Sequence, residues 1–264
     1  MTIRNVIKET DSPSTRDSLE HDFRAVGISE GMTLAVHSSL SSMGYVTGGP
    51  VAVILALEDV VGESGTLAMP THTGDLTDPA NWENPPVPES WHDQIRENVP
   101  AFQKDLSPSW GVGAIPECFR KQRQVLRSDH PIVSWAAWGP RASIVTGTHQ
   151  LAMSQGESSP LARLYDLDAY VLLLGVGYNV NTCCHLAEYR CKFAPLKKCR
   201  HAGPVLENGT ARWTSYEDIY WYEKDFETIG ASFEEGVGNV SLGNVGRAGA
   251  KLFSFRRMVD HAVA

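Results

Sequence analysis

The chain has 264 residues, of which 42% are hydrophobic, a formal net charge of −8 and five cysteines. This length and apolar content suffice for one large α/β domain, but no segment reaches the roughly 18 apolar residues of a membrane helix. The acidic balance and the lack of a Lys/Arg run argue against a nucleic-acid surface. The polar start, MTIRNVIKETDSPSTRD, is untypical of a signal peptide, so we expect a cytoplasmic protein with reduced thiols.

The first elements alternate between helix and strand. Thr15 and Gly27 predict the N-cap and the end of an amphipathic helix. Apolar strands are expected at 32–37 and 66–70, separated by a Ser/Gly loop and a helix over 50–61. This order is typical of two parallel strands joined by a crossover helix.

The segment after the second strand breaks this rhythm. It is rich in proline, holds Trp82 and Trp91 and carries scattered acids with little periodicity. Stretches of this length without regular structure are typically functional loops. We therefore expect one domain spanning 1–264, in which residues 71–110 form a lid or substrate loop.

The α/β pattern then resumes. The clearest strand is AYVLLLG, a continuous apolar run of the kind that lies inside a two-sided parallel sheet. Asn208-Gly209 predicts a hairpin. A further strand is expected at 132–137, and helices at 114–121, 142–146, 218–230 and 255–262. The predicted fold class is α/β, with three α/β/α layers around a central mixed sheet, an inserted Pro/Trp-rich lid and a late antiparallel excursion.

A histidine and a glutamate follow the AYVLLLG strand. If a helix begins at Asn181 or Thr182, His185 and Glu188 lie three residues apart on one face near its start. Glu188 can then hold one imidazole nitrogen while the other faces a substrate, as general-base catalysis requires. An exposed ion pair has the same spacing, but ligands of α/β sheets bind beyond the carboxyl ends of the strands, which favours catalysis.

Cysteines near His185 raise the alternative of a metal site. Cys183 and Cys184 are adjacent and cannot point the same way on a helix, and the chain contains no CxxC. We therefore expect no metal and interpret both cysteines as core residues. The chain also lacks GxxxxGK[ST], GxGxxG and GxSxG, which argues against a P-loop, a dinucleotide fold and a nucleophile-elbow hydrolase.

His37 lies where the first strand opens into SSLSSMG. Its imidazole and the loop amides could meet a phosphate or an acyl group. A strand-end histidine satisfied by its neighbours is the equally weighted alternative.

Six motifs, in order along the chain, resemble the aminoglycoside 3-N-acetyltransferases, also called antibiotic N-acetyltransferases. They are VHSSLSSMG (36–44), MPTHTGDLTDP (69–79), PPVPESW (85–91), RSDHPIVSWAAWG (127–139), GESSPLARLYDL (156–167) and LLLGVGYNVNTCCHLAEYR (172–190). The tail from FETIGASFE through GNVGRAGAKLF is similar too. The chain departs from the family pattern at the Cys183-Cys184 pair and at Trp110, where methionine is commoner.

The resemblance implies antibiotic resistance by acetyl-CoA-dependent transfer to the 3-amine of a 2-deoxystreptamine aminoglycoside. It implies that His185 and Glu188 do the acid–base work. His37, which we also expect to be a catalytic residue, lies beside the loop that binds coenzyme A. Direct attack of the amine on the thioester needs donors for the thioester oxygen, for which Thr71, Thr182 or a loop amide are candidates. The expected cofactor contacts are His37, Ser38, Ser39, Leu40, Thr71 and Ser128.

A cationic aminoglycoside would be attracted to an acidic cleft under the lid. The expected substrate contacts are His72, Asp75, Glu89, Trp91, Glu217 and Glu235, with Glu223 among further acids that could rim the pocket. We expect coenzyme A and the antibiotic as partners, no nucleic acid and no membrane, and leave a homodimer open. The alternatives are acetyl transfer to another small amine, non-catalytic binding of coenzyme A or an aminoglycoside, and a metal hydrolase.

Overall fold

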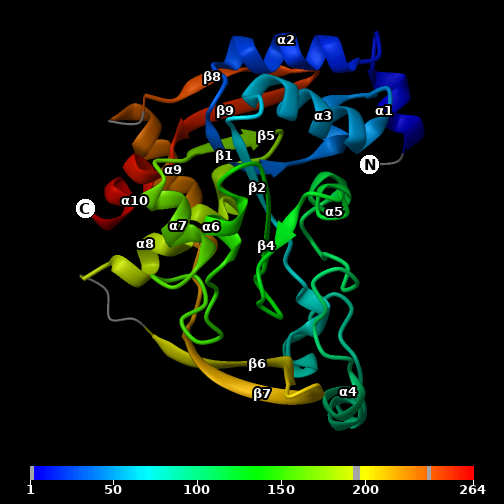
Figure 1. The fold of residues 1–264 in the computed structure, drawn as a ribbon, viewed down its shortest axis with the longest axis vertical. Coiled ribbons are helices and arrows are strands. Elements are labelled where there is room, and N and C mark those ends of the chain that lie inside the picture. The colour runs from blue at the N-terminus through cyan, green and yellow to red at the C-terminus, as the bar shows by residue number, and fades with distance from the viewer. Residues whose placement is uncertain (1–2, 193–196, 237–238) are drawn as a thin grey trace.

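The computed structural model describes residues 3–192, 197–236 and 239–264. Its central sheet is mixed and has the strand order β3-β4-β2-β1-β5-β9-β8 (Figure 1). β1 runs parallel to both β2 and β5, and the other neighbouring pairs are antiparallel. The strands are β1 (Thr33–Ser38), β2 (Thr66–Pro70), β3 (Leu126–Arg127), β4 (Trp135–Trp138), β5 (Tyr170–Leu174), β8 (Ser241–Val245) and β9 (Ala248–Ser254).

Helices cover both faces of this sheet. On β5, Leu172 and Leu174 join one core cluster while Val171 and Leu173 join the other, because alternate side chains of a strand point to opposite faces. The first cluster includes residues of α2 (Arg16–Val26), α3 (Gly49–Val61) and α5 (Ala114–Phe119). The second includes residues of α6 (Ala142–Thr146), α7 (Pro160–Asp166), α8 (His185–Arg190), α9 (Phe226–Glu235) and α10 (Phe255–Val263). The expected three-layer α/β/α fold is confirmed.

Capping residues in the sequence predicted the ends of α2 correctly, whereas another helix was predicted wrongly. Thr15 caps α2 and forms a capping box with Ser18, and Gly27 ends the helix at a φ of 105°. The helix expected over 218–230 is wrong, because β7 continues to Ile219 and α9 begins only at Phe226. The buried carboxylate of Asp218 is hydrogen-bonded at the end of that strand. β8 and β9 were not predicted.

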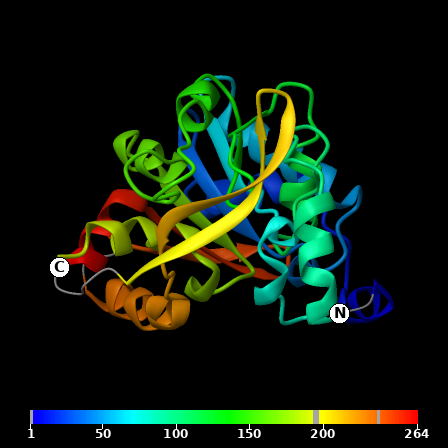
Figure 2. The same cartoon turned by 90° about the horizontal axis from the view of Figure 1, so that it is seen from below.

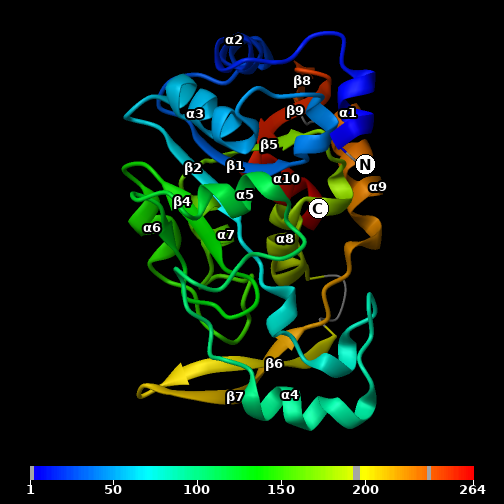
Figure 3. The ribbon, with the colours of Figure 1, turned by 90° about the vertical axis from the view of Figure 1, so that its right-hand side faces the viewer.

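A second lobe lies beyond the carboxyl ends of the parallel strands (Figures 1 and 3). Its antiparallel hairpin is β6 (Lys198–Glu207) and β7 (Thr210–Ile219), which Asn208-Gly209 joins as predicted. The inserted segment closes on itself where the Trp110 amide donates to the His72 carbonyl at 2.7 Å. It joins the hairpin where the Phe102 amide donates to the Pro204 carbonyl at 3.2 Å, and α4 (His92–Asn98) lies beside β7.

Seen from below, the hairpin crosses the edge of the sheet where the parallel strands end (Figure 2). The remaining helix, α1 (Ile3–Glu9), lies at the end of the molecule away from the hairpin (Figures 1 and 3). Within the part of the chain that the structure describes, no helix combines the length and apolarity that crossing a bilayer requires.

Candidate functional site

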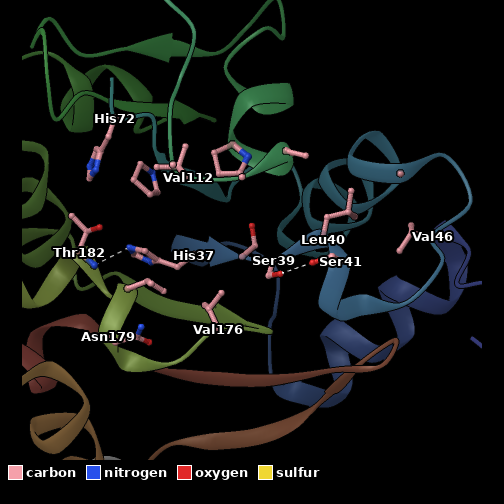
Figure 4. A pocket seen from close by; sticks show the side chains of 18 of the residues that line it. His37, Ser39, Leu40, Ser41, Val46, His72, Val112, Val176, Asn179 and Thr182 are labelled. Atoms are coloured by element: carbon pink, nitrogen blue, oxygen red, sulfur yellow. Dashed lines mark hydrogen bonds between the residues drawn. The ribbon is translucent and has the colours of Figure 1, made fainter. Parts of the chain in front are cut away.

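A cavity of about 700 Å³ opens at the carboxyl ends of β1, β2 and β5 (Figure 4). The loop Ser38–Ser41 lines it after β1, His72 lines it after β2, and Val176, Asn179 and Thr182 line it after β5. Because parallel strands end at one edge of the sheet, three segments that are distant in sequence meet here. The cavity is large enough for two small ligands or one large one.

His185 reaches this cavity from the start of α8. A 3₁₀ turn, Thr182–Cys184, precedes it, and the Asn181 side chain caps that turn by accepting from the Cys183 amide. His185 Nδ1 is hydrogen-bonded to Glu188, whose other carboxylate oxygen accepts from the Tyr222 amide at 2.6 Å. Glu188 is thus fixed at both oxygens, and the pairing expected from the spacing is present.

The second imidazole nitrogen of His185 has a different neighbour. Nε2 lies 3.6 Å from Glu223 Oε1, and Glu223 is 63% exposed and lines the cavity. Burial alone would lower the pKa of His185, but hydrogen bonding and charge from Glu188 and Glu223 outweigh it, so the pKa is raised above 6.5. The ring is therefore basic enough to take up a proton near neutral pH.

His37 faces the cavity in the neutral form. Its Nε2 accepts from the Thr182 amide at 3.1 Å (Figure 4), so its proton lies on Nδ1. Burial, reinforced by nearby His185, lowers the pKa of His37 to about 3. Burial likewise lowers the pKa of His72, across the cavity, to about 3.

Three buried polar atoms of the cavity wall have no hydrogen-bond partner within the described residues. They are His37 Nδ1, Ser38 Oγ and His72 Nε2. Buried polar groups are normally satisfied, so these atoms indicate that a polar ligand completes the wall.

The loops after β1 and β5 hold each other in place. Ser42 Oγ lies 3.1 Å from the Gly175 carbonyl, to which it can donate, and 2.9 Å from Ser39 Oγ. Gly175 has a φ of +68°, and a Cβ there would lie 2.6 Å from the Ser42 Cβ. Only glycine lets the Ser42 side chain come this close to the backbone at 175. The loop after β1 is thereby fixed against the end of β5, the strand that leads to His185.

Two expected cofactor contacts lie outside the cavity wall. Thr71 is buried, and its hydroxyl lies 3.1 Å from the Ser134 carbonyl, to which it can donate. Ser128 is buried as well, where its hydroxyl accepts from the Trp135 amide and pairs with His149. Both side chains hold β4 and its neighbours together and present no free group to the cavity.

The expected substrate contacts divide in the same way. His72 lines the cavity, whereas Asp75, Glu89, Trp91, Glu217 and Glu235 do not. Glu217 pairs with Lys198 at 2.9 Å on the hairpin, and Trp91 lines a separate hollow beside α4. Among the described residues that line the cavity, the acidic one is Glu223. No pattern in the sequence distinguishes it from its acidic neighbours.

The cysteines beside His185 are core residues. Cys183 and Cys184 are 0% and 1% exposed and belong to the second core cluster, which confirms their interpretation as packing residues. Across residues 3–192, 197–236 and 239–264, no group of three or more His, Cys, Asp or Glu side chains is arranged to hold a metal ion.

Comparison with known proteins identifies relatives of the whole chain. The sequence model of the family described as aminoglycoside 3-N-acetyltransferase matches residues 35–264. The SPbeta prophage-derived aminoglycoside N(3')-acetyltransferase-like protein YokD of Bacillus subtilis (strain 168) is 44% identical over 262 residues, which cover 98% of this chain and 95% of that protein. Its crystal structure superposes with a TM-score of 0.94 at 43% identity, over 98% of this chain and 95% of that one.

Two further relatives carry functional descriptions. Aminoglycoside N(3)-acetyltransferase VII of Streptomyces paromomycinus is 35% identical over 98% of this chain and 93% of that protein. A solved structure described as AAC-IIIb binary with CoASH is 30% identical and has a TM-score of 0.83, over 96% of each chain.

Proposed function

This chain belongs to the aminoglycoside 3-N-acetyltransferase family, and from that premise we propose that it transfers the acetyl group of acetyl-CoA to the 3-amino group of a 2-deoxystreptamine aminoglycoside. The observation that carries the proposal is the His185 imidazole, held by Glu188 at one nitrogen and presenting the other at a cavity of about 700 Å³. Acetyl-CoA is an intracellular metabolite, so the reaction belongs in the cytoplasm.

The loop Ser38–Ser41 is the proposed binding site for coenzyme A. Ser38, Ser39 and Leu40 line the cavity beside His37, and the unpartnered Ser38 hydroxyl and His37 Nδ1 fit a ligand with amide and thioester oxygens. When bound, acetyl-CoA supplies an acyl group activated by its sulfur leaving group. The chain's own part is to place that group within reach of His185.

His185 acts as the general base in this proposal. An amine must lose a proton before or as it attacks a carbonyl carbon. Nε2 accepts that proton, and Glu188 stabilises the imidazolium from the Nδ1 side. The amine nitrogen bonds to the acetyl carbon as the carbon–sulfur bond breaks, and the protonated His185 is placed to return the proton to the departing sulfur.

Glu223 is the proposed anchor for the cationic acceptor. Its carboxylate lies on the cavity side of His185, and its side chain is exposed enough to turn toward an arriving ammonium group. The thioester oxygen needs hydrogen-bond donors as it gains charge. The Thr71 hydroxyl is occupied by Ser134, the Thr182 amide by His37 and the Ser39 amide by a backbone carbonyl of β5. This leaves the Thr182 hydroxyl, other amides of the loop after β1 and His37 Nδ1.

The second lobe is the proposed substrate cover. Residues 71–110 and the β6–β7 hairpin lie beyond the carboxyl ends of the parallel strands (Figure 1). The chain runs from the end of β7 to Glu223 within four residues. This arrangement lets differences in the lobe select among aminoglycosides without altering the base.

A thiol-release assay with acetyl-CoA and kanamycin-, gentamicin- and apramycin-type compounds tests the function, with product NMR to locate the acetyl group. We expect acetylation at the 3-amine and a loss of roughly 10²–10⁴-fold in turnover for His185→Ala. Coenzyme A binding should persist in that variant. No product from any aminoglycoside would favour a different small amine as acceptor, and unchanged turnover of His185→Ala would remove the base assignment.

A further inference from the structure

The buried carboxylate of Asp218 links the β6–β7 hairpin to α8, the helix that carries His185 and Glu188. Asp218, at the end of β7, is fully buried. Its Oδ2 accepts from the Ser154 amide at 3.0 Å and the Ser154 hydroxyl at 2.6 Å. Its Oδ1 accepts from the Tyr189 hydroxyl at 2.6 Å and the Ile219 amide at 2.9 Å. Four donors satisfy the charge, so this carboxylate is a fixed junction between three segments.

Tyr189 is the α8 member of this junction. It directly follows Glu188, and its hydroxyl donates to Asp218 while accepting from Trp221 Nε1 at 2.9 Å. Burial, together with the charge of Asp218, raises the pKa of Tyr189, so the phenol keeps its proton and remains a donor. The Tyr189 hydroxyl therefore links the Trp221 indole, in the segment after β7, to α8, the helix that carries His185.

That segment then runs directly over the base. The Trp221 ring packs against His185, with centroids 5.9 Å apart, and stacks on His201 at 4.5 Å. The next residue, Tyr222, donates its amide to Glu188, and the one after it is Glu223, beside His185 Nε2. Residues 221–223 thus contact His185 or Glu188, and the Tyr189 hydroxyl holds the first of these residues, Trp221, by a hydrogen bond.

We propose that Tyr189 and Asp218 are positioning residues, which hold the segment 221–223 in register over His185 and thereby couple the β6–β7 hairpin to the catalytic base. The proposal rests on the proposed function, in which His185 is that base. It assigns a role to a buried network that makes no contact with the cavity: without it, Glu223 is no longer kept beside Nε2 and the base loses its acidic partner on the substrate side.

The charges that face His185 make this coupling measurable. Glu188 and Glu223 face the ring from α8 and from the segment after β7. His37 faces it from β1, and His72 faces it from the segment after β2. Glu223→Gln removes one of the two carboxylates and should lower the pKa of His185 by about half a unit, since the carboxylate is partly solvated. That shift reports how closely Glu223 is held.

The experiment is an NMR titration of the histidines, with His185 assigned as the signal missing from His185→Gln. The Glu223→Gln shift is measured in the wild-type, Tyr189→Phe and Tyr165→Phe backgrounds. Tyr165 is the matched control because its hydroxyl also donates to an aspartate, Asp260, at 2.7 Å, but on the exposed side of α7. We expect the full shift in the wild type and in Tyr165→Phe, and less than half of it in Tyr189→Phe.

An equal Glu223→Gln shift in all three backgrounds would overturn the proposal. If Tyr189→Phe does not fold, Trp221→Phe removes the other partner of the same hydroxyl, keeps an aromatic ring against His185 and should give the same reduced shift. The titration needs no turnover, so a chain that acetylates no aminoglycoside would defeat the proposed function while this test of positioning still stands. Under the proposed function, kcat of Tyr189→Phe should also fall, by roughly tenfold.

Discussion

Glu188→Gln tests the catalytic dyad through the direction of two hydrogen bonds. One carboxylate oxygen of Glu188 accepts from the Tyr222 amide and the other pairs with His185 Nδ1. A glutamine that keeps the Tyr222 bond must turn its NH2 group toward Nδ1, which then has to accept. The imidazole proton moves to Nε2, so the nitrogen facing the cavity no longer has a free lone pair.

The size of the effect follows from this tautomer switch. The side chain keeps its shape, so the fold and the cavity should change little, but the base points a proton at its substrate. An amide in place of a triad carboxylate costs on the order of 10⁴ in kcat in a well-studied protease. We expect a loss of roughly 10²–10⁴-fold here, or about 3–5 kcal/mol in the barrier.

The assay is steady-state thiol release with acetyl-CoA and an accepted aminoglycoside, with melting temperature as the check on folding. Glu157→Gln is the matched control, because Glu157 pairs with Arg190 of the same helix through bonds of 2.7 and 2.9 Å, away from the cavity. This control should keep wild-type turnover. A Glu188→Gln enzyme whose kcat stays within about threefold of the wild type would show that His185 is not the base, since loss of the base should cost far more.

Three further predictions concern proton uptake and the cofactor loop. Because the pKa of His185 is raised above 6.5 and the base acts unprotonated, kcat/KM should fall as pH drops through a midpoint above 6.5; a pH–rate profile with a lower midpoint would contradict this. Gly175→Ala should weaken coenzyme A binding and lower the melting temperature more than Gly209→Ala, which shares the positive φ but has nothing within 4 Å; calorimetry and thermal melts compare them, and equal losses would count against the packed loops. Ser38→Ala should leave stability unchanged, because its hydroxyl has no partner among the described residues, yet weaken coenzyme A by roughly 2- to 10-fold in titration calorimetry; unaltered affinity would remove Ser38 from the site.

Local sequence patterns were enough to predict β5, the His185–Glu188 pair and the position of the loop after β1. The apolar run of β5 needs both faces covered, and the spacing of His185 and Glu188 needs only one helical turn, so neither depends on distant parts of the chain. The loop after β1 could be placed as well, because parallel strands bring their carboxyl ends together.

The acidic residues could not be sorted in this way. Asp75 and Glu217 lie on segments of the second lobe whose positions depend on tertiary contacts. Neither carboxylate lines the cavity, and Glu217 pairs with Lys198 instead. Glu223 was expected only as one of several acids that could rim the pocket, because no sequence pattern set it apart from its acidic neighbours. β7 persists to Ile219, where a helix was expected, since the buried Asp218 is satisfied by donors from Ser154 and Tyr189, which no local pattern reveals.

The measurement that bears most directly on the base is the structure of this chain with coenzyme A and an accepted aminoglycoside bound together. We expect the 3-amino nitrogen within hydrogen-bond reach of His185 Nε2, at about 2.6–3.2 Å, with Glu188 still on Nδ1. A 3-amino group bound in the cavity next to a different acceptor, with His185 Nε2 facing protein or solvent, would contradict this expectation.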